Sequence, residues 1–235
     1  MSIEASLVHA LDGGRGADAA DRLCKACVAL LSVDAAAISL VFDGMNKGTL
    51  GGSSDQARLF DELQFTFGEG PCLESVATRA PVLALDLGAE VVAGRWPAYG
   101  PALLDQGIAG VFAIPVLVAG EYVGALDLFR RQVVALDGHD LSGALVAAEL
   151  AEMPLLDLLA MTEQEPLEPG TPAWTELDKI TRDEVSQATG MLVAQLDVEP
   201  AQALVRLRAH AYATNRSVTA VARDVLDHRL RLDAG

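Results

Sequence analysis

Three cysteines and four histidines are the side chains of this sequence best suited to catalysis or to metal binding. Cys24 and Cys27 form a C-x-x-C pair, but the pair lies inside a segment of helical periodicity. A redox pair would stand at a helix N-terminus, where a thiolate is stabilised, so we expect both cysteines to be core residues. The histidines lie far apart, and they offer neither a nucleophile–histidine arrangement nor zinc-ligand spacing. The sequence accordingly predicts no catalytic residue, no metal site and no cofactor.

Cys72 ends the short segment FGEGPC. The two glycines, Gly68 and Gly70, permit a tight reversal of the backbone, and Pro71 suits the first turn of a following helix. The segment is not a phosphate-binding loop, because the GK[ST] ending is missing. In a first helical turn, the helix dipole would lower the pKa of Cys72 somewhat. We expect a structural turn, and the alternative that it lines a small-molecule pocket stays open.

Arginines gather near the C-terminus of an otherwise acidic chain. The whole sequence has a formal net charge of −16, which would oppose the approach of a polyanion. Residues 201–232, however, carry six arginines against two aspartates, a local net charge of +4. Arginine can pair with phosphate through two parallel hydrogen bonds and can stack on an unpaired base. The pattern favours a nucleic-acid-binding surface, and the alternative of ordinary solvated arginines stays open.

A glycine lies inside the helical segment SQATGMLVAQL, which precedes these arginines. Glycine within a helix costs about 1 kcal/mol relative to alanine. Because Ala188 and Gly190 have almost no side chain, another backbone or a nucleotide could approach them closely. Gln187 and Thr189 would offer hydrogen-bonding groups beside them. The alternative is that Gly190 only permits close helix packing.

Two modules would position these residues, with a linker between them. The segment TEQEPLEPGTPAW, residues 162–174, is rich in proline and glutamate and is not expected to continue a helix. We therefore expect one domain at residues 1–161 and a second at residues 175–235. No run of eighteen apolar residues and no signal peptide is visible, and the three cysteines fit no disulfide framework. A cytoplasmic protein without a membrane segment is expected.

The first module mixes helical and strand patterns. Ala119 and Gly120 join two strands in a predicted hairpin, and Pro115 predicts an edge position or a bulge. The result is an α+β domain with a largely antiparallel sheet flanked by helices. Helices are expected at residues 19–32, 55–65, 72–79 and 139–153, and strands at 35–44, 47–54, 81–87, 110–120 and 121–131.

The second module shows only helical patterns. Apolar stripes predict helices at residues 177–196, 200–215 and 218–232, with Ser217 as the N-cap of the last. The expected fold is an all-α three-helix bundle. Because about 55 residues are marginal for independent stability, docking or dimerisation through the first helix is expected.

The first module resembles the GAF domain family over roughly residues 17–153. The segment FGEGPCLESV, the W-P-x-Y piece from Trp96 to Tyr99 and the strand pair ending in GALDLFR carry the resemblance. It implies a sheet flanked by helices and a role in sensing a ligand or in joining two chains. A bilin chromophore is not expected, because no histidine lies between Cys72 and His139. The candidate ligand pocket consists of Glu69, Cys72, Trp96 and Tyr99.

The second module resembles the ANTAR domain, an RNA-binding three-helix module of transcription antiterminators. QATGML at residues 187–192 and LVRLR at residues 204–208 carry much of the resemblance. Many members have lysine where Thr189 stands, so one phosphate contact is missing here. The resemblance implies that a homodimer binds paired hairpin loops in nascent RNA and prevents formation of a terminator. The expected RNA-binding residues are Arg182, Gln187, Ala188, Thr189, Gly190, Arg206, Arg208 and Arg216.

The sequence thus predicts an RNA-binding transcription antitermination regulator, with an unidentified small-molecule or protein signal acting on its GAF-like module. Two alternatives remain. The last two helices and the turn ATNRSVT also resemble a helix-turn-helix, which would bind duplex DNA. Cys72 could instead be the nucleophile of a GAF-type enzyme resembling the free methionine sulfoxide reductases, although a resolving partner is not evident.

Overall fold

The structure, a computed structural model, describes residues 2–42, 44–164, 171, 180, 182–214 and 216–232. It divides into two compact units, residues 1–180 and residues 181–235. Within the described part, none of the helices combines the length and the apolar character needed to cross a bilayer.

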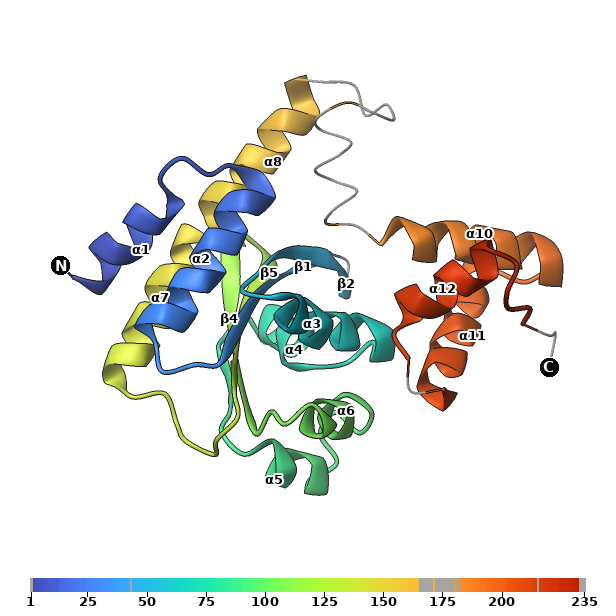
Figure 1. The fold of residues 1–235 in the computed structure, drawn as a ribbon, viewed down its shortest axis with the longest axis horizontal. Helices are drawn as coiled ribbons and strands as arrows, with labels where there is room; N and C mark the ends of the chain where they lie inside the picture. Colours follow the sequence, from blue (N-terminus) through green and yellow to red (C-terminus); the bar gives the residue numbers. More distant parts are fainter. Residues whose placement is uncertain are drawn as a thin grey trace. The chain divides into compact units, whose positions relative to one another are not determined.

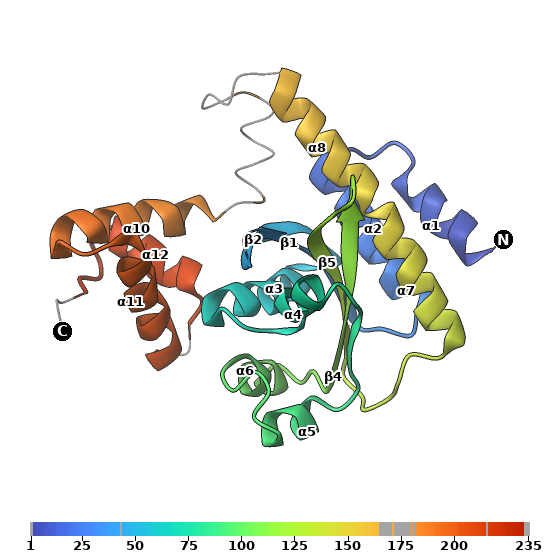
Figure 2. The same cartoon turned by 180° about the vertical axis from the view of Figure 1, so that it is seen from behind.

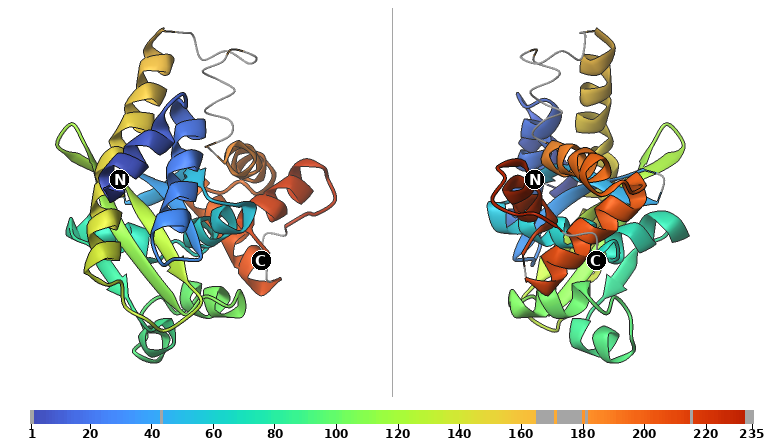
Figure 3. Two further views of the ribbon diagram at one scale, coloured as in Figure 1. Left: turned by 60° about the vertical axis from the view of Figure 1, so that its left-hand side comes forward. Right: turned by 90° about the vertical axis from the view of Figure 1, so that its right-hand side faces the viewer.

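The first unit is built on a five-stranded antiparallel sheet with the strand order β2-β1-β5-β4-β3 (Figure 1). Ala119 and Gly120 close the β4–β5 hairpin with positive φ angles of 50° and 90°, as a two-residue turn between twisted strands requires. This loop reaches beyond the neighbouring helices (Figure 3). The strands are β1 Ala35–Phe42, β2 Met45–Gly52, β3 Val82–Ala84, β4 Gly110–Val118 and β5 Glu121–Arg130.

Among the described residues, Pro115 lies in a part of β4 that has no neighbouring strand on one side, which agrees with the edge position that the sequence predicts. It pairs with Ala125 of β5 on one side, whereas the pairing of β3 with β4 covers only Val111 to Ala113. The missing N–H of proline therefore breaks no hydrogen bond between β3 and β4.

Helices cover both faces of the sheet, as Figures 1 and 2 show from opposite sides. Ala36 and Ile38 of β1 point into the core under α1, α2, α7 and α8, whereas Ala35 and Ala37 point into the core under α3 to α6. The predicted α+β class and the antiparallel sheet are confirmed. The helices are α1 Ile3–Leu11, α2 Gly16–Leu30, α3 Asp55–Phe67, α4 Pro71–Thr78, α5 Leu87–Val92, α6 Tyr99–Asp105, α7 Gly138–Leu150 and α8 Glu152–Gln164.

Four of these helices, α1, α5, α6 and α8, were not expected from the sequence. The helix α8 begins directly after α7 and runs to Gln164, into the segment expected to be a linker. Pro154 does not prevent it, because the N–H groups of a first helical turn have no intrahelical partner to lose. The rest of the expected linker lies outside the described residues, apart from Thr171.

The second unit is a bundle of three helices, α10 Asp183–Leu196, α11 Pro200–Ala213 and α12 Val218–Leu226. Ser217 caps α12 by accepting a hydrogen bond from the backbone N–H of Ala220, as predicted. The helix ends before the expected residue 232, because His228 adopts a left-handed conformation with φ 58°. The buried stripes consist of Val185, Ala188, Leu192, Ala203, Leu207, Ala211, Val218, Val221, Ala222 and Val225.

Candidate functional site

The FGEGPC segment of the first unit is a turn between α3 and α4. Its two glycines have φ angles of 69° and 141°, and a Cβ at Gly70 would lie 2.5 Å from Gln64 Oε1. Glu69 Oε1 accepts hydrogen bonds from the backbone N–H groups of Ala98 at 2.6 Å and Tyr99 at 2.9 Å. The predicted structural turn is confirmed, and the Glu69 carboxylate ties it to the start of α6.

The aromatic residues of the candidate pocket pack into the core. Trp96 is 6% exposed, with the Arg95 guanidinium 4.3 Å from its ring centroid and Tyr99 in edge-to-face contact at 6.3 Å. A cavity of about 490 Å³ beside Arg130 and one of about 340 Å³ beside Tyr122 lie elsewhere in the unit. None of the four candidate residues lines either cavity.

Cys72 is fully buried, and its environment reverses the expected effect on its acidity. Burial raises the pKa of the thiol well above its ordinary value, and the charges of Asp127 and Asp61 raise it further. The expectation of a lowered pKa was wrong, because loss of solvation outweighs the dipole of the short helix α4. Cys24 and Cys27 are buried core residues as predicted, and burial raises the pKa of Cys27 to about 12.

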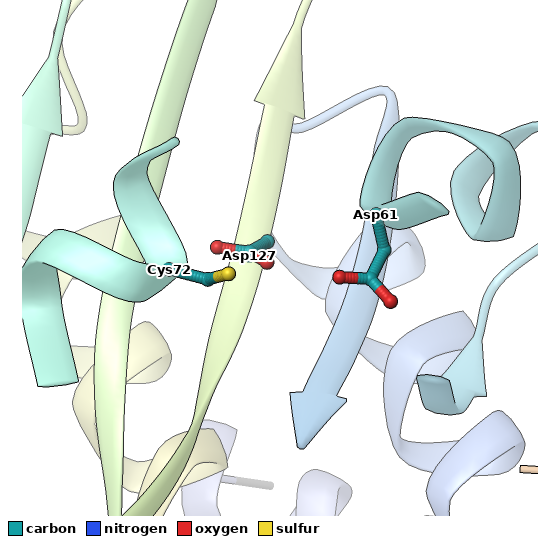
Figure 4. A group of neighbouring side chains, drawn as sticks. All are labelled: Asp61, Cys72 and Asp127. Atoms are coloured by element: carbon teal, nitrogen blue, oxygen red, sulfur yellow. The ribbon is translucent and has the colours of Figure 1, made fainter. Parts of the chain in front are cut away.

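A buried polar cluster surrounds Cys72 on the α3–α6 side of the sheet. Asp61 from α3, Cys72 from α4 and Asp127 from β5 converge there, with their ligand atoms within 4.8 Å of one another (Figure 4). Ser39 Oγ lies 2.5 Å from Asp61 Oδ1 and 2.7 Å from Asp127 Oδ2. Burial and the nearby charge of Asp61 raise the pKa of Asp127 well above its ordinary value. The structure therefore places two acids and a thiol together, away from water.

In the second unit, the predicted residues of α10 divide between its surface and its core. Gln187 and Gly190 are exposed, and a Cβ at Gly190 would meet no described atom within 4 Å. Close helix packing therefore does not explain this glycine. Ala188, in contrast, is fully buried in the bundle, so its small side chain serves packing rather than the approach of a nucleotide. The Thr189 hydroxyl donates to the carbonyl oxygen of Val185 at 2.6 Å and is already used within the helix.

The structure brings Arg182 and Arg208 together, although they are far apart in the sequence. Arg182 occupies the N-cap position of α10, and Arg208 lies on α11. Burial lowers the pKa of Arg208, and the charge of Arg182 lowers it further, so the two guanidinium groups lie close enough to repel each other. Both side chains are half-buried, as is that of Arg206.

Other arginines of the basic segment form ion pairs within the unit. Arg216 donates to Asp224 at 2.7 Å, and Arg229 donates to the same carboxylate at 2.8 Å. Arg223 of α12 donates to Glu184 of α10 at 2.8 Å. The expected excess of positive charge is therefore partly neutralised, which the local count of charges did not anticipate.

Family models match both units. The GAF domain model matches residues 16–155 and the ANTAR domain model matches residues 180–226. The chain belongs to the GAF domain family. With an ANTAR domain after the GAF domain, it matches the GAF–ANTAR family, and its general role is regulatory. No curated protein matches the chain.

Solved structures share the fold of the GAF domain. The GAF domain of an Acinetobacter phosphoenolpyruvate-protein phosphotransferase has a TM-score of 0.53 and 11% identity, covering 67% of this chain and 93% of that one. The corresponding Coxiella burnetii domain has a TM-score of 0.52 and 17% identity, with coverages of 67% and 93%. The reduced form of fRMsr of Staphylococcus aureus has a TM-score of 0.50 and 11% identity, with coverages of 65% and 92%. At such identities, the likeness concerns the fold.

In this GAF domain, sequence reasoning missed the two acids of the buried cluster. Signals for both exist in the sequence. Asp127 stands inside the apolar strand segment GALDLF, at a position that alternates into the core. Asp61 follows Ala57 by four residues on the buried side of α3 and follows Phe60 directly. An acid at a core position is rare enough to mark a candidate site.

Proposed function

We propose that this GAF–ANTAR chain is an RNA-binding transcription antitermination regulator. Its ANTAR domain would bind hairpin loops of nascent transcripts in the cytoplasm, and its GAF domain would receive a signal. The observation that carries the proposal is Gly190, an exposed helix glycine that no packing contact requires. A glycine that weakens its helix without a steric reason is expected where another molecule approaches the backbone.

The surface around Gly190 suits a nucleotide. Arg182, Ser186 and Gly190 recur every four residues, so they lie along one side of α10, and Gln187 is exposed beside them. None of the three neutral residues has a charged or bulky side chain that would block a base. The guanidinium groups of Arg182 and Arg208 repel each other, and a phosphate group close to both would offset that repulsion. RNA loops present phosphates together with unstacked bases, whose edges amide and guanidinium groups can read.

Competition between RNA structures would turn this binding into regulation. The hairpins that the protein binds and the terminator stem use the same nucleotides, as the ANTAR resemblance implies. Protein binding then needs only to outweigh the extra stability of the terminator. A signal at the GAF domain would act by changing the population of RNA-competent chains.

Homodimerisation is part of the proposal. Leu145 of α7 and both Met153 and Leu156 of α8 are exposed apolar side chains. A second copy of the chain would bury them and present two ANTAR domains to two loops. Sedimentation of the full chain tests this arrangement. A chain that stays monomeric at every concentration and still binds the paired-hairpin RNA would contradict it.

We also infer that the chain is not an enzyme. Cys72, the candidate nucleophile, is fully buried, and burial raises the pKa of its thiol. A nucleophilic cysteine instead requires a thiolate that a substrate can reach.

Filter binding of the full chain to a paired-hairpin RNA and to duplex DNA of similar length tests the RNA proposal. We expect preference for the RNA, and weaker binding with a shallower salt dependence for Arg208→Ala. Arg231→Ala is the matched control, because Arg231 is an exposed arginine of the same basic segment that lies beyond the end of α12. Preference for duplex DNA would favour the helix-turn-helix alternative, and no binding to either would refute the proposal.

A further inference from the structure

The buried cluster of the GAF domain contains groups that could bind a metal ion. We propose that Cys72 Sγ and carboxylate oxygens of Asp61 and Asp127 bind one divalent transition-metal ion, Zn²⁺ or an ion of similar preference. All three side chains are fully buried, and their ligand atoms lie within 4.8 Å of one another (Figure 4). The proposal is independent of RNA binding, so either can fail without the other.

Neutral polar groups hold both carboxylates in place. Ser39 Oγ bridges them, at 2.5 Å from Asp61 Oδ1 and 2.7 Å from Asp127 Oδ2. Gln64 donates to Asp127 Oδ2 at 2.9 Å, and Asn46 donates to Asp61 Oδ1 at 2.7 Å. Metal sites in proteins depend on such outer hydrogen bonds to orient the ligands. The bonds come from β1, β2 and α3, so the arrangement does not depend on one flexible loop.

Two buried polar atoms lack a partner beside this network. Asp127 Oδ1 and the Tyr99 hydroxyl make no hydrogen bond to any part of the chain that the structure describes, and both residues are fully buried. Burial raises the pKa of Tyr99, and so do the charges of Asp127, Cys72 and Asp61. Leaving a buried polar atom unsatisfied costs free energy, so each such atom in a folded protein calls for an explanation. A bound ion would give Asp127 Oδ1 a partner.

The charge of the cluster also calls for a cation. The two groups that hydrogen-bond to Asp127 are a hydroxyl and an amide, and neither carries a positive charge. Two carboxylates this close in the interior repel each other when both are ionised. Buried charges are normally paired or bound to metal, and a divalent cation between the acids would remove the repulsion.

The ligand set indicates the class of metal. Mg²⁺ and Ca²⁺ prefer oxygen ligands alone, whereas the sulfur of Cys72 favours a softer transition-metal ion. Zn²⁺ accepts sulfur together with carboxylate oxygen and is usually four-coordinate. Three protein ligands would leave a fourth position for a water molecule.

Cobalt provides a direct test, because Co²⁺ occupies zinc sites and gives a thiolate-to-metal absorption band. The full chain would be stripped with a chelator, unfolded and refolded with Co²⁺ alone. We expect a band that saturates at one ion per chain and disappears when Zn²⁺ is added. Cys72→Ser should lose the band, and the matched control Cys27→Ser should keep it, because Cys27 lies on α2 and packs into the other core.

A second variant distinguishes loss of metal binding from loss of folding. Asp127→Asn keeps the shape of the side chain but removes a charged ligand, and circular dichroism reports whether it folds. Zn²⁺ should raise the Tm of the parent chain and leave that of folded Asp127→Asn unchanged. The proposal is overturned if the parent chain binds neither ion, or if the band persists in Cys72→Ser.

Discussion

Replacing Gly190 with alanine should stabilise the ANTAR domain and weaken RNA binding at the same time. Gly190 is exposed in the interior of α10, and a Cβ there would meet no described atom within 4 Å. Alanine is therefore favoured over glycine by about 1 kcal/mol, without any steric penalty. For a small domain, 1 kcal/mol raises Tm by roughly 4–8 °C. If RNA contacts the backbone here, however, the added methyl group overpacks that contact at a cost of about 1–3 kcal/mol.

The two effects are measured on the same protein. Thermal unfolding gives the change in Tm, and filter binding to the hairpin RNA should show a loss of roughly tenfold or more in affinity, since about 1.4 kcal/mol corresponds to tenfold. Gly138→Ala is the matched control, because Gly138 is also exposed with no described atom near its Cβ position but lies on α7 of the GAF domain. That variant should leave RNA affinity unchanged. A Gly190→Ala protein that is more stable and binds RNA as tightly as the parent chain would show that RNA does not contact the backbone at Gly190.

Further predictions concern the thiol, the arginines and acid stability. Cys72 should react with a thiol reagent near neutral pH only as fast as the protein unfolds, because its thiol is buried and has a raised pKa. Rapid labelling of the folded chain would instead support the enzyme alternative. Arg208→Ala should reduce the magnitude of the slope of log affinity against log salt concentration by about 0.7, the value for one lost contact to a single-stranded phosphate. Arg229→Ala should change the slope less, because that arginine is paired with acids. Burial raises the pKa of Glu184, but the hydrogen bonds from Arg223, a backbone hydrogen bond and the charge of Arg223 together outweigh burial and lower it. The stability from this pair is therefore present above about pH 4.3 and is lost as the pH falls through the lowered value. Arg223→Ala should therefore show a smaller fall in Tm on acidification than the parent chain, and an equal fall would count against this pair.

The sequence predicts the architecture well where periodicity is strong. The strand alternation of β1 and the turn at Ala119 and Gly120 indicated the sheet and its hairpin, and the buried stripe of α12 indicated the bundle. The short helices α5 and α6 were missed because six or seven residues give too few turns for a periodic signal. The helix α8 was missed because the helical pattern expected at residues 139–153 stops before Pro154, whereas proline is tolerated in the first turn of a new helix.

The candidate sites depend more on tertiary contacts. The charge count of residues 201–232 could not show that Arg216 pairs with Asp224, since that pairing depends on how the turn enters α12. The approach of Arg182 to Arg208 depends on the packing of α10 against α11. In the same way, Asp61 and Asp127 come together only when α3 packs on the sheet beside β5.

RNA binding by α10 and α11 can be tested in cells by crosslinking the chain to RNA. The bound RNA is then sequenced, and the crosslinked peptides are identified by mass spectrometry. We expect crosslinks in the loops of paired hairpins that overlap terminators, and crosslinked peptides from α10 and α11. We also expect Gly190→Ala to reduce them. Crosslinks spread evenly over transcripts, or confined to peptides of the GAF domain, would contradict this prediction.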